Sequence, residues 1–190
     1  FDDYDRIGPG LMCLELGLHS SQPSDILYES IFLMMLEKNG DLHPVFAGRP
    51  LMRNWDYVNG ELNPFYYHTN SESWKTIHYY AKKLFRDNQF DQMFPTSCCR
   101  LDGKVLMDEE TLFSTAGKDS VTKDLIIKTV NLSQYSIKAH IDAGISQAQA
   151  DIFTLRNTDY LPQIVEDSKC SGPDVYQGLI DFTKPYTFLA

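Results

Sequence analysis

The sequence lacks any apolar run of the roughly 18 residues that a helix needs to cross a bilayer. The longest run, residues 31–36, is short and is closed on both sides by polar residues. Clusters of basic residues are also missing, because Lys and Arg are scattered and the formal net charge is −9. A surface of that sign repels phosphate, so we expect neither a membrane nor a nucleic acid as a partner.

Motifs for metal binding are missing as well. The cysteines are Cys13, Cys98, Cys99 and Cys170; they form no CxxC pair, and no histidine pair at helical spacing accompanies them. A structural zinc site is therefore not expected. A bond between the adjacent Cys98 and Cys99 would be strained, and the sequence leaves open whether either thiol pairs with Cys170.

The start of the chain has no initiator Met and none of the basic and apolar regions of a signal peptide. The chain ends on an apolar stretch, residues 186–190, that is typical of a strand cut short. Both ends lead us to expect a piece of a longer protein, whose N-terminal part precedes residue 1. The 190 residues, 43% of them hydrophobic, can still bury one sizeable core or two small ones.

What the sequence does contain falls into two halves. Up to about residue 88, short apolar runs at 11–14 and 42–47 alternate with helical patterns at 26–38 and 74–86. Such runs are typical of strands that are buried on both faces, as in parallel sheets. The order strand, helix, strand, helix cannot close a sheet alone, because it would leave the edges of its strands open.

Cap residues mark the ends of these helices. Ser24-Asp25 offers an N-cap for the first helix, and Asn39-Gly40 offers a C-cap in which Gly40 would adopt the left-handed conformation. Residues 71–73 would open the second helix, with Trp74 packing near its start.

Beyond residue 88 the period of the apolar residues changes to two. The clearest strands are 124–130 and 135–141, which a turn at 131–134 would join, and a further turn is expected at 117–120. Several short strands at this spacing indicate an antiparallel sandwich. The sequence therefore predicts a mixed α and β chain in which strand-helix units are followed by an all-β region.

Several blocks resemble glycoside hydrolase family 51 α-L-arabinofuranosidases in order and in spacing. The first block is Phe1-Asp2-Asp3-Tyr4-Asp5-Arg6-Ile7-Gly8-Pro9, after which Glu15 falls at the family's distance from Gly8-Pro9. The others are residues 28–41, Pro50-Leu51 followed by Trp55, residues 78–88, and residues 112–114 with 123–131. The resemblance covers about residues 1–143.

The resemblance implies a fold and an activity. Residues 1–88 would be the last strand-helix units of a catalytic (β/α)8 TIM barrel, and residues 89–190 a jelly-roll-like antiparallel β-sandwich. The full protein would remove terminal α-L-arabinofuranosyl residues, with retention, from arabinose-containing polysaccharides or oligosaccharides. It would need no metal or organic cofactor, and it would be secreted.

Glu15 is the candidate catalytic residue. Retaining glycosidases need two carboxyl groups roughly 5–5.5 Å apart, which lie at the carboxyl ends of strands in a barrel. Glu15 ends an apolar strand, and the family pattern makes it the nucleophile. The acid/base would lie on an earlier strand, after an Asn, and no residue upstream of Glu15 supplies it. A solvated or Arg-paired carboxylate at a strand end is the structural alternative for Glu15.

Three further residues are candidates for binding substrate. Trp55 and Tyr57 follow the second strand and could stack on sugars, although such aromatics also cover barrel rims. His19 could hydrogen-bond a sugar hydroxyl or simply lie on the surface. Two other readings stay open: a non-catalytic β-sandwich that binds carbohydrate or supports the barrel, and a degenerate, inactive paralogue. Leu14, Leu16 and Gly48 depart from the family pattern and favour the second.

Overall fold

The computed structural model describes the side chains of residues 25–40, 68–99, 112–156 and 172–189, and the backbone alone of short strands in 12–13, 45–46, 52–54 and 66–67. In chain order the elements are β1 (Met12–Cys13), α1 (Asp25–Lys38), β2 (Val45–Phe46), β3 (Met52–Asn54), β4 (Tyr66–His68), β5 (Ser73–Lys75), α2 (Ile77–Asp87), β6 (Gln92–Phe94), β7 (Leu112–Lys118), β8 (Leu125–Asn131), β9 (Ile137–Ala139), β10 (Gln147–Thr154), β11 (Asp174–Asp181) and β12 (Tyr186–Phe188). The described part of the chain is therefore mixed α and β, with mostly strands and few helices.

The first half contains the parallel strands that its apolar runs predict. β1 pairs with β2 in parallel, with Met12 opposite Val45. α1 connects these two strands along the chain, so β1, α1 and β2 form a strand-helix-strand unit. β3 also pairs in parallel with β4, and β4 then pairs with β5 in the antiparallel sense.

In the described part of the second half all strand pairs are antiparallel, as the alternating pattern predicts. They form the sheets β6-β7-β8, β10-β11 and β9-β12. The predicted turn at 131–134 does not join neighbouring strands, because β8 pairs with β7 and β9 pairs with β12. The Asn131 amide accounts for this crossing: it donates to the Tyr135 carbonyl at 3.0 Å and to the Leu189 carbonyl at 3.0 Å, which ties the bend to the C-terminal strand.

α1 has the predicted bounds but ends differently from expectation. Gly40 does not take up a left-handed conformation. The Asn39 side chain instead donates to the Met35 carbonyl at 2.8 Å, and the backbone N–H of Asn39 donates to the Leu36 carbonyl at 3.1 Å. These bonds satisfy carbonyls of the last turn without a left-handed residue. Neither helix in the described residues is long and apolar enough to span a membrane.

The second helix begins later than the sequence indicates. Ser73–Lys75, which we expected at its start, form β5 and pair with β4. α2 therefore starts at Ile77, after Thr76 in an extended conformation. Trp74 is buried as expected, with 7% of its surface exposed, but it packs from a strand and not from a helix. Pairing with β4 has outweighed the helical pattern of this short segment.

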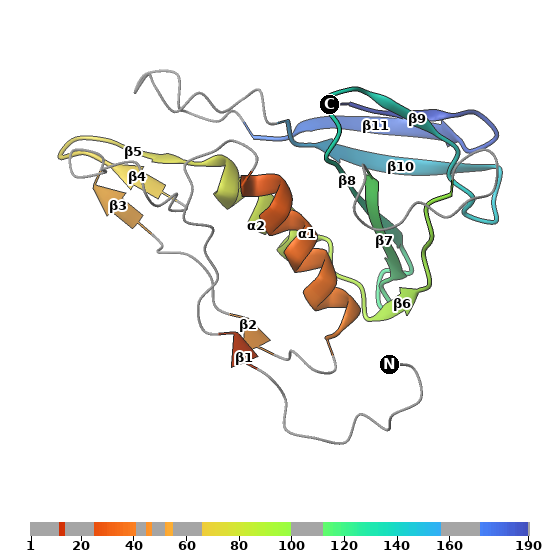
Figure 1. Cartoon of the computed structure of the whole chain (residues 1–190), viewed down its shortest axis with the longest axis horizontal. Helices are drawn as coiled ribbons and strands as arrows, with labels where there is room; N and C mark the ends of the chain where they lie inside the picture. The colour runs from red at the N-terminus through yellow and green to blue at the C-terminus, as the bar shows by residue number, and fades with distance from the viewer. Residues whose placement is uncertain are drawn as a thin grey trace.

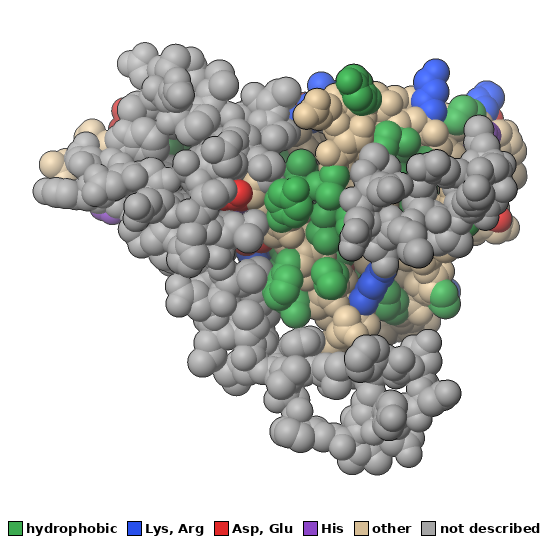
Figure 2. All heavy atoms as spheres, in the orientation of Figure 1, with side chains coloured by type: hydrophobic (Ala, Val, Ile, Leu, Met, Phe, Trp, Pro, Cys, Tyr) green, Lys and Arg blue, Asp and Glu red, His purple; other side chains and the backbone are tan. Residues whose placement is uncertain are grey.

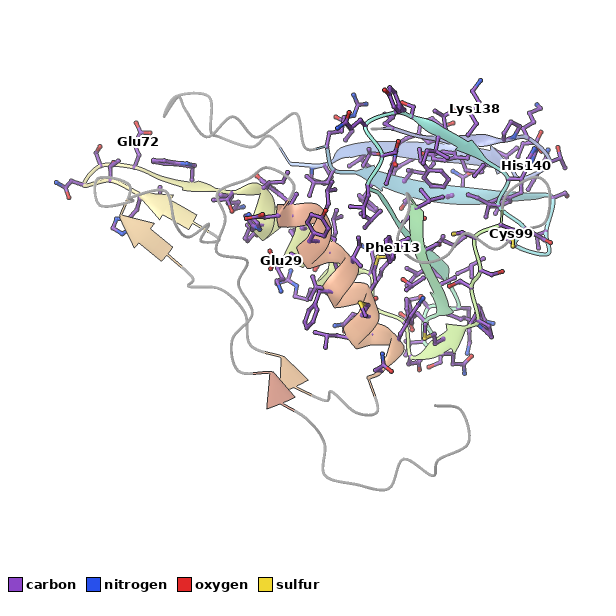
Figure 3. All side chains as sticks on the ribbon, viewed as in Figure 1. Glu29, Glu72, Cys99, Phe113, Lys138 and His140 are labelled. Carbon is purple, nitrogen blue, oxygen red and sulfur yellow. The ribbon has the colours of Figure 1, made fainter. Side chains whose placement is uncertain are left out.

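α1 is apolar on every side, and two neighbours cover most of it (Figure 1). Ile26 packs with Ile77 and Ala81 of α2. Further along α1, Ile31 and Met34 pack with Val130 of β8. Phe113 of β7 packs against the same cluster (Figure 3). α1 thus joins the first half of the chain to the antiparallel sheet β6-β7-β8.

One stripe of α1 remains uncovered. Figure 2 shows hydrophobic side chains gathered over the helix, and Tyr28 and Met35 are 55% and 53% exposed. The helix therefore places two adjacent methionines, Met34 and Met35, in opposite environments.

The turn between β7 and β8 starts two residues later than predicted. Gly117 and Lys118 belong to β7, and the turn is built on Asp119, whose carboxylate accepts the backbone N–H of Val121 at 2.7 Å. Asp91 fixes the same turn from outside, since its carboxylate accepts the Ser120 N–H at 2.8 Å and the Ser120 hydroxyl. These bonds lower the pKa of Asp91 below its ordinary value of 3.8.

We expect Met34→Ala to lower the free energy of unfolding by about 2–5 kcal/mol, because it removes a side chain buried between α1 and β8. Met35→Ala is the matched control, and should change the free energy by no more than about 0.5 kcal/mol. Urea unfolding followed by circular dichroism measures both. Equal effects of the two substitutions would contradict the placement of α1.

Asp91→Asn should lower the melting temperature at pH 6, because the ionised carboxylate that holds Ser120 is lost. A carboxyl whose pKa is depressed on folding stabilises fully above its unfolded value, and this contribution disappears as the pH falls through the folded pKa. The difference in melting temperature between wild type and variant should therefore shrink as the pH falls below about 3.8, and it should disappear once the pH has fallen through the lowered pKa of folded Asp91. A difference that does not change with pH would show that the charge of Asp91 is not involved.

Candidate functional site

The four residues predicted for the site, Glu15, His19, Trp55 and Tyr57, lie outside the described residues. The structure does describe the strands that lead to them. β1 ends at Cys13, two positions before Glu15 in the sequence, and β3 ends at Asn54, directly before Trp55. Because β1 and β2 are parallel, their carboxyl ends meet at one edge of the sheet.

A buried ionic cluster lies between the two helices, α1 and α2. Glu29 of α1 lies 2.7 Å from His78 of α2, measured between Oε2 and Nδ1, and both side chains are 2% exposed. The Nζ of Lys82 lies 3.3 Å from the other Glu29 oxygen, Oε1. Figure 3 shows Glu29 on the side of α1 that is turned away from the antiparallel strands. One carboxylate thus contacts two basic side chains of α2, one turn apart.

The burial of this cluster argues for a structural role. A general acid, base or nucleophile must touch its substrate, and side chains that are 2% exposed offer no access to a sugar. What the cluster can do is hold α1 and α2 in one register, because a slip of either helix would separate the buried Glu29 carboxylate from His78 and Lys82. This cluster was not predicted from the sequence. A signal was present, because Glu29 follows Ile26 by three residues and precedes Leu33 by four, which places it on the same buried face of the helix.

A second ion pair links α1 to the sheet. The ammonium of Lys128 in β8 bonds to the Glu37 carboxylate, and these side chains are 12% and 24% exposed. The same ammonium lies 4.7 Å from the centre of the Phe85 ring and 4.8 Å from that of Phe90. The Phe90 ring in turn rests on Gly117, where any side chain would collide with it. Although it lies in the last turn of α1, Glu37 is therefore partly buried and paired.

The pKa shifts of this pair have one cause. Burial raises the pKa of Glu37 above 4.5, although Lys128 acts in the opposite direction. Burial likewise lowers the pKa of Lys128 below 10.5, against the effect of Glu37. Both shifts disfavour the charged form, so desolvation exceeds the attraction between the charges, and the pair serves to fix geometry more than to add stability.

The described residues contain no group of three or more His, Cys, Asp and Glu side chains that could hold a metal ion. In the same part of the chain, Cys98 is half-buried and Cys99 is exposed. Cys170, which the sequence left as a possible partner of either thiol, lies outside the described residues.

Glu29→Gln should lower the free energy of unfolding by about 3 kcal/mol, because it removes the buried carboxylate charge that contacts both His78 and Lys82. Asp87→Asn is the control. Asp87 also contacts two cations, Lys83 and Arg86, but it does so at the surface, so this substitution should change the free energy of unfolding little. Urea unfolding at pH 7 gives both values. A Glu29→Gln protein as stable as the Asp87→Asn protein would show that the cluster does not hold the helices.

Comparison with known proteins gives one relative in sequence and two in structure. No family model matches the chain. An extracellular exo-α-L-arabinofuranosidase of Streptomyces chartreusis is 31% identical over 96 residues, which are 50% of this chain and 12% of that protein. An arabinose-bound GH51 α-L-arabinofuranosidase superposes with a TM-score of 0.72 at 17% identity, over 100% of this chain and 32% of its own. A second arabinofuranosidase gives a TM-score of 0.66 at 16% identity, over 95% of this chain and 41% of its own.

The chain therefore spans a minor part of each protein that it matches: about an eighth of the curated relative, and a third to two fifths of the solved structures. The sequence match and the two fold matches are all to arabinofuranosidases.

Proposed function

We propose that this chain, whose sequence and fold match arabinofuranosidases, is part of a retaining glycoside hydrolase of family 51 that removes terminal α-L-arabinofuranosyl residues. The observation that carries the proposal is that the sequence match, over half of this chain, and the fold match, over all of it, are both to arabinofuranosidases. The substrates would be arabinose-containing polysaccharides or oligosaccharides. Like the extracellular relative, the protein would act outside the cell.

The architecture follows the same proposal. Residues 1–88 would be the end of the catalytic (β/α)8 TIM barrel, and residues 89–190 the jelly-roll-like β-sandwich. The parallel pair β1-β2 with α1 as its connection supports the first assignment, because a barrel is a repetition of this unit. The antiparallel sheets from β6 onward support the second.

Glu15 would be the nucleophile. It follows β1 by two positions, and active sites of such barrels lie beyond the carboxyl ends of the strands. Its carboxylate would attack the anomeric carbon of the arabinofuranosyl residue while a second carboxylic acid protonates the departing oxygen. Water would then cleave the resulting ester at the anomeric carbon, giving its proton to the second carboxylate and releasing Glu15.

The second carboxyl group would come from another part of the longer protein, since no residue before Glu15 fits that role. The 190-residue chain alone would then bind without hydrolysing. Trp55 and Tyr57 would stack on the sugar rings, and His19 would hydrogen-bond a hydroxyl group. Trp55 directly follows β3, and β3, like β1, pairs with a parallel strand.

Glu15→Ala in the longer protein should reduce the release of 4-nitrophenol from 4-nitrophenyl α-L-arabinofuranoside by at least about 10⁴-fold, because the covalent step is lost. Azide should restore turnover by occupying the space of the missing carboxylate, and it should give an arabinosyl azide of inverted configuration. Glu72→Gln, on the exposed loop before β5, is the control and should keep wild-type activity.

The alternatives make different predictions for this experiment. An inactive longer protein would favour a degenerate paralogue or a non-catalytic module. An active protein in which Glu15→Ala has no effect would leave the family assignment in place but overturn the role of Glu15.

A further inference from the structure

A groove lies on the β10-β11 hairpin, far along the chain from the proposed catalytic residue. β10 and β11 run side by side (Figure 1), and each residue of β10 from Gln147 to Thr154 pairs with one of β11. A cavity of about 400 Å³ opens on this hairpin. Its walls combine aliphatic, aromatic and charged side chains: Ile152, Thr154, Arg156, Asp174, Val175, Tyr176, Ile180 and Tyr186. Cavities of roughly 300–1,000 Å³ with a few placed polar groups are typical of small-ligand sites.

The Tyr176 ring is the central feature of this groove. A side chain at Gly178 would meet the Tyr176 hydroxyl oxygen at 2.5 Å and its Cζ at 2.8 Å, so the ring lies down along the strand over the glycine. The residue opposite Gly178 is Ala150, which is also small. A glycine within a strand often marks such a close approach. Although it lies against the sheet, Tyr176 remains 54% exposed, and it therefore presents a flat aromatic surface.

Hydrogen-bonding groups stand beside this surface. The guanidinium of Arg156 lies 3.4 Å from the Asp174 carboxylate, at the ends of the paired strands. Both side chains are open to solvent, at 43% and 73% exposure, so a ligand can reach donors of one and acceptors of the other. Together they carry no net charge. This arrangement suits a ligand that is neutral, flat on one face and rich in hydroxyl groups.

We propose that this groove is a second sugar-binding site, which holds a neutral arabinosyl oligosaccharide with one ring stacked on Tyr176. The identity of the sugar rests on the proposed function, whereas the site itself rests on the groove. The C–H face of a sugar ring would cover the aromatic surface. The hydroxyl groups of the sugar would form hydrogen bonds with Arg156 and Asp174 in place of those with water. The antiparallel half of the protein would thus keep the polymer near the catalytic half.

The charge of the groove distinguishes a sugar from an anionic ligand. A phosphate or carboxylate ligand would require Arg156 without an opposing acid, and Asp174 would repel it. Binding of a neutral sugar should therefore change little between 0.05 and 0.5 M NaCl, whereas binding of an anion would weaken strongly.

The test is affinity electrophoresis of the 190-residue chain in native gels that contain soluble arabinan, with isothermal titration of α-1,5-linked arabinotriose as the second measurement. Wild type should be retarded by the polysaccharide. Tyr176→Ala should weaken binding about tenfold or more, since the stacking surface is lost. Gly178→Val should weaken it similarly by displacing the ring. Tyr135→Ala removes a tyrosine that is 76% exposed on a bend outside the groove, and should leave binding unchanged.

Circular dichroism and melting temperature establish that each variant is folded. The proposal is overturned if wild type shows no retardation and no heat of binding, if Tyr176→Ala binds as well as wild type, or if salt abolishes binding. Trp55→Ala separates this site from the proposed catalytic one, because it removes an aromatic ring proposed to stack on sugar at the catalytic centre and should still leave the chain retarded. Retention of binding in the Trp55→Ala protein supports the second site, whereas loss of binding in that variant would place the sugar at the catalytic centre and contradict the second site.

Discussion

The need to bury α1 determines how the described parts of this protein fit together. Its apolar residues occupy every side of the helix, so a single neighbour cannot cover them. α2 covers the first turns through Ile77 and Ala81, and β8 covers the later turns through Val130. Leu27 contacts both clusters, which makes them continuous.

Polar groups buried at the same interfaces make the packing specific. Apolar contacts alone would tolerate a helix that slides or rotates, but the Glu29–His78 pair and the Glu37–Lys128 pair have a single arrangement. One pair fixes α1 against α2, and the other fixes it against β8. Since α1 connects β1 to β2, this fixation also bears on the strand that precedes Glu15. A catalytic carboxylate displaced by about 1 Å can lose about a hundredfold in rate, so such a support is relevant to the proposed chemistry.

The sequence predicts local structure well where one signal dominates. The bounds of α1 follow from a long segment without Gly or Pro, and β8 follows from a run rich in β-branched residues. The sequence predicts local structure less well where contacts with residues distant in the chain determine it. Residues 73–75 look helical but pair with β4, and the bend after Asn131 leads to another sheet because Asn131 bonds to the carbonyl of Leu189. The Glu29 cluster and the Tyr176 groove depend on residues brought together from separate elements, and spacing alone does not show such contacts. The candidate residues Glu15, His19, Trp55 and Tyr57 come from the resemblance, and their roles remain predictions.

Native-state hydrogen exchange tests the central claim most directly, namely that α1 joins the two halves of the chain into one cooperative unit. The amide groups of Ile31 and Met34 in α1 and of Val130 in β8 share one apolar cluster. They should therefore open with the same free energy, and that value should equal the free energy of global unfolding. Fast exchange of the α1 amides beside fully protected β8 amides would contradict the account, since it would mean that the helix detaches while the sheet stays folded.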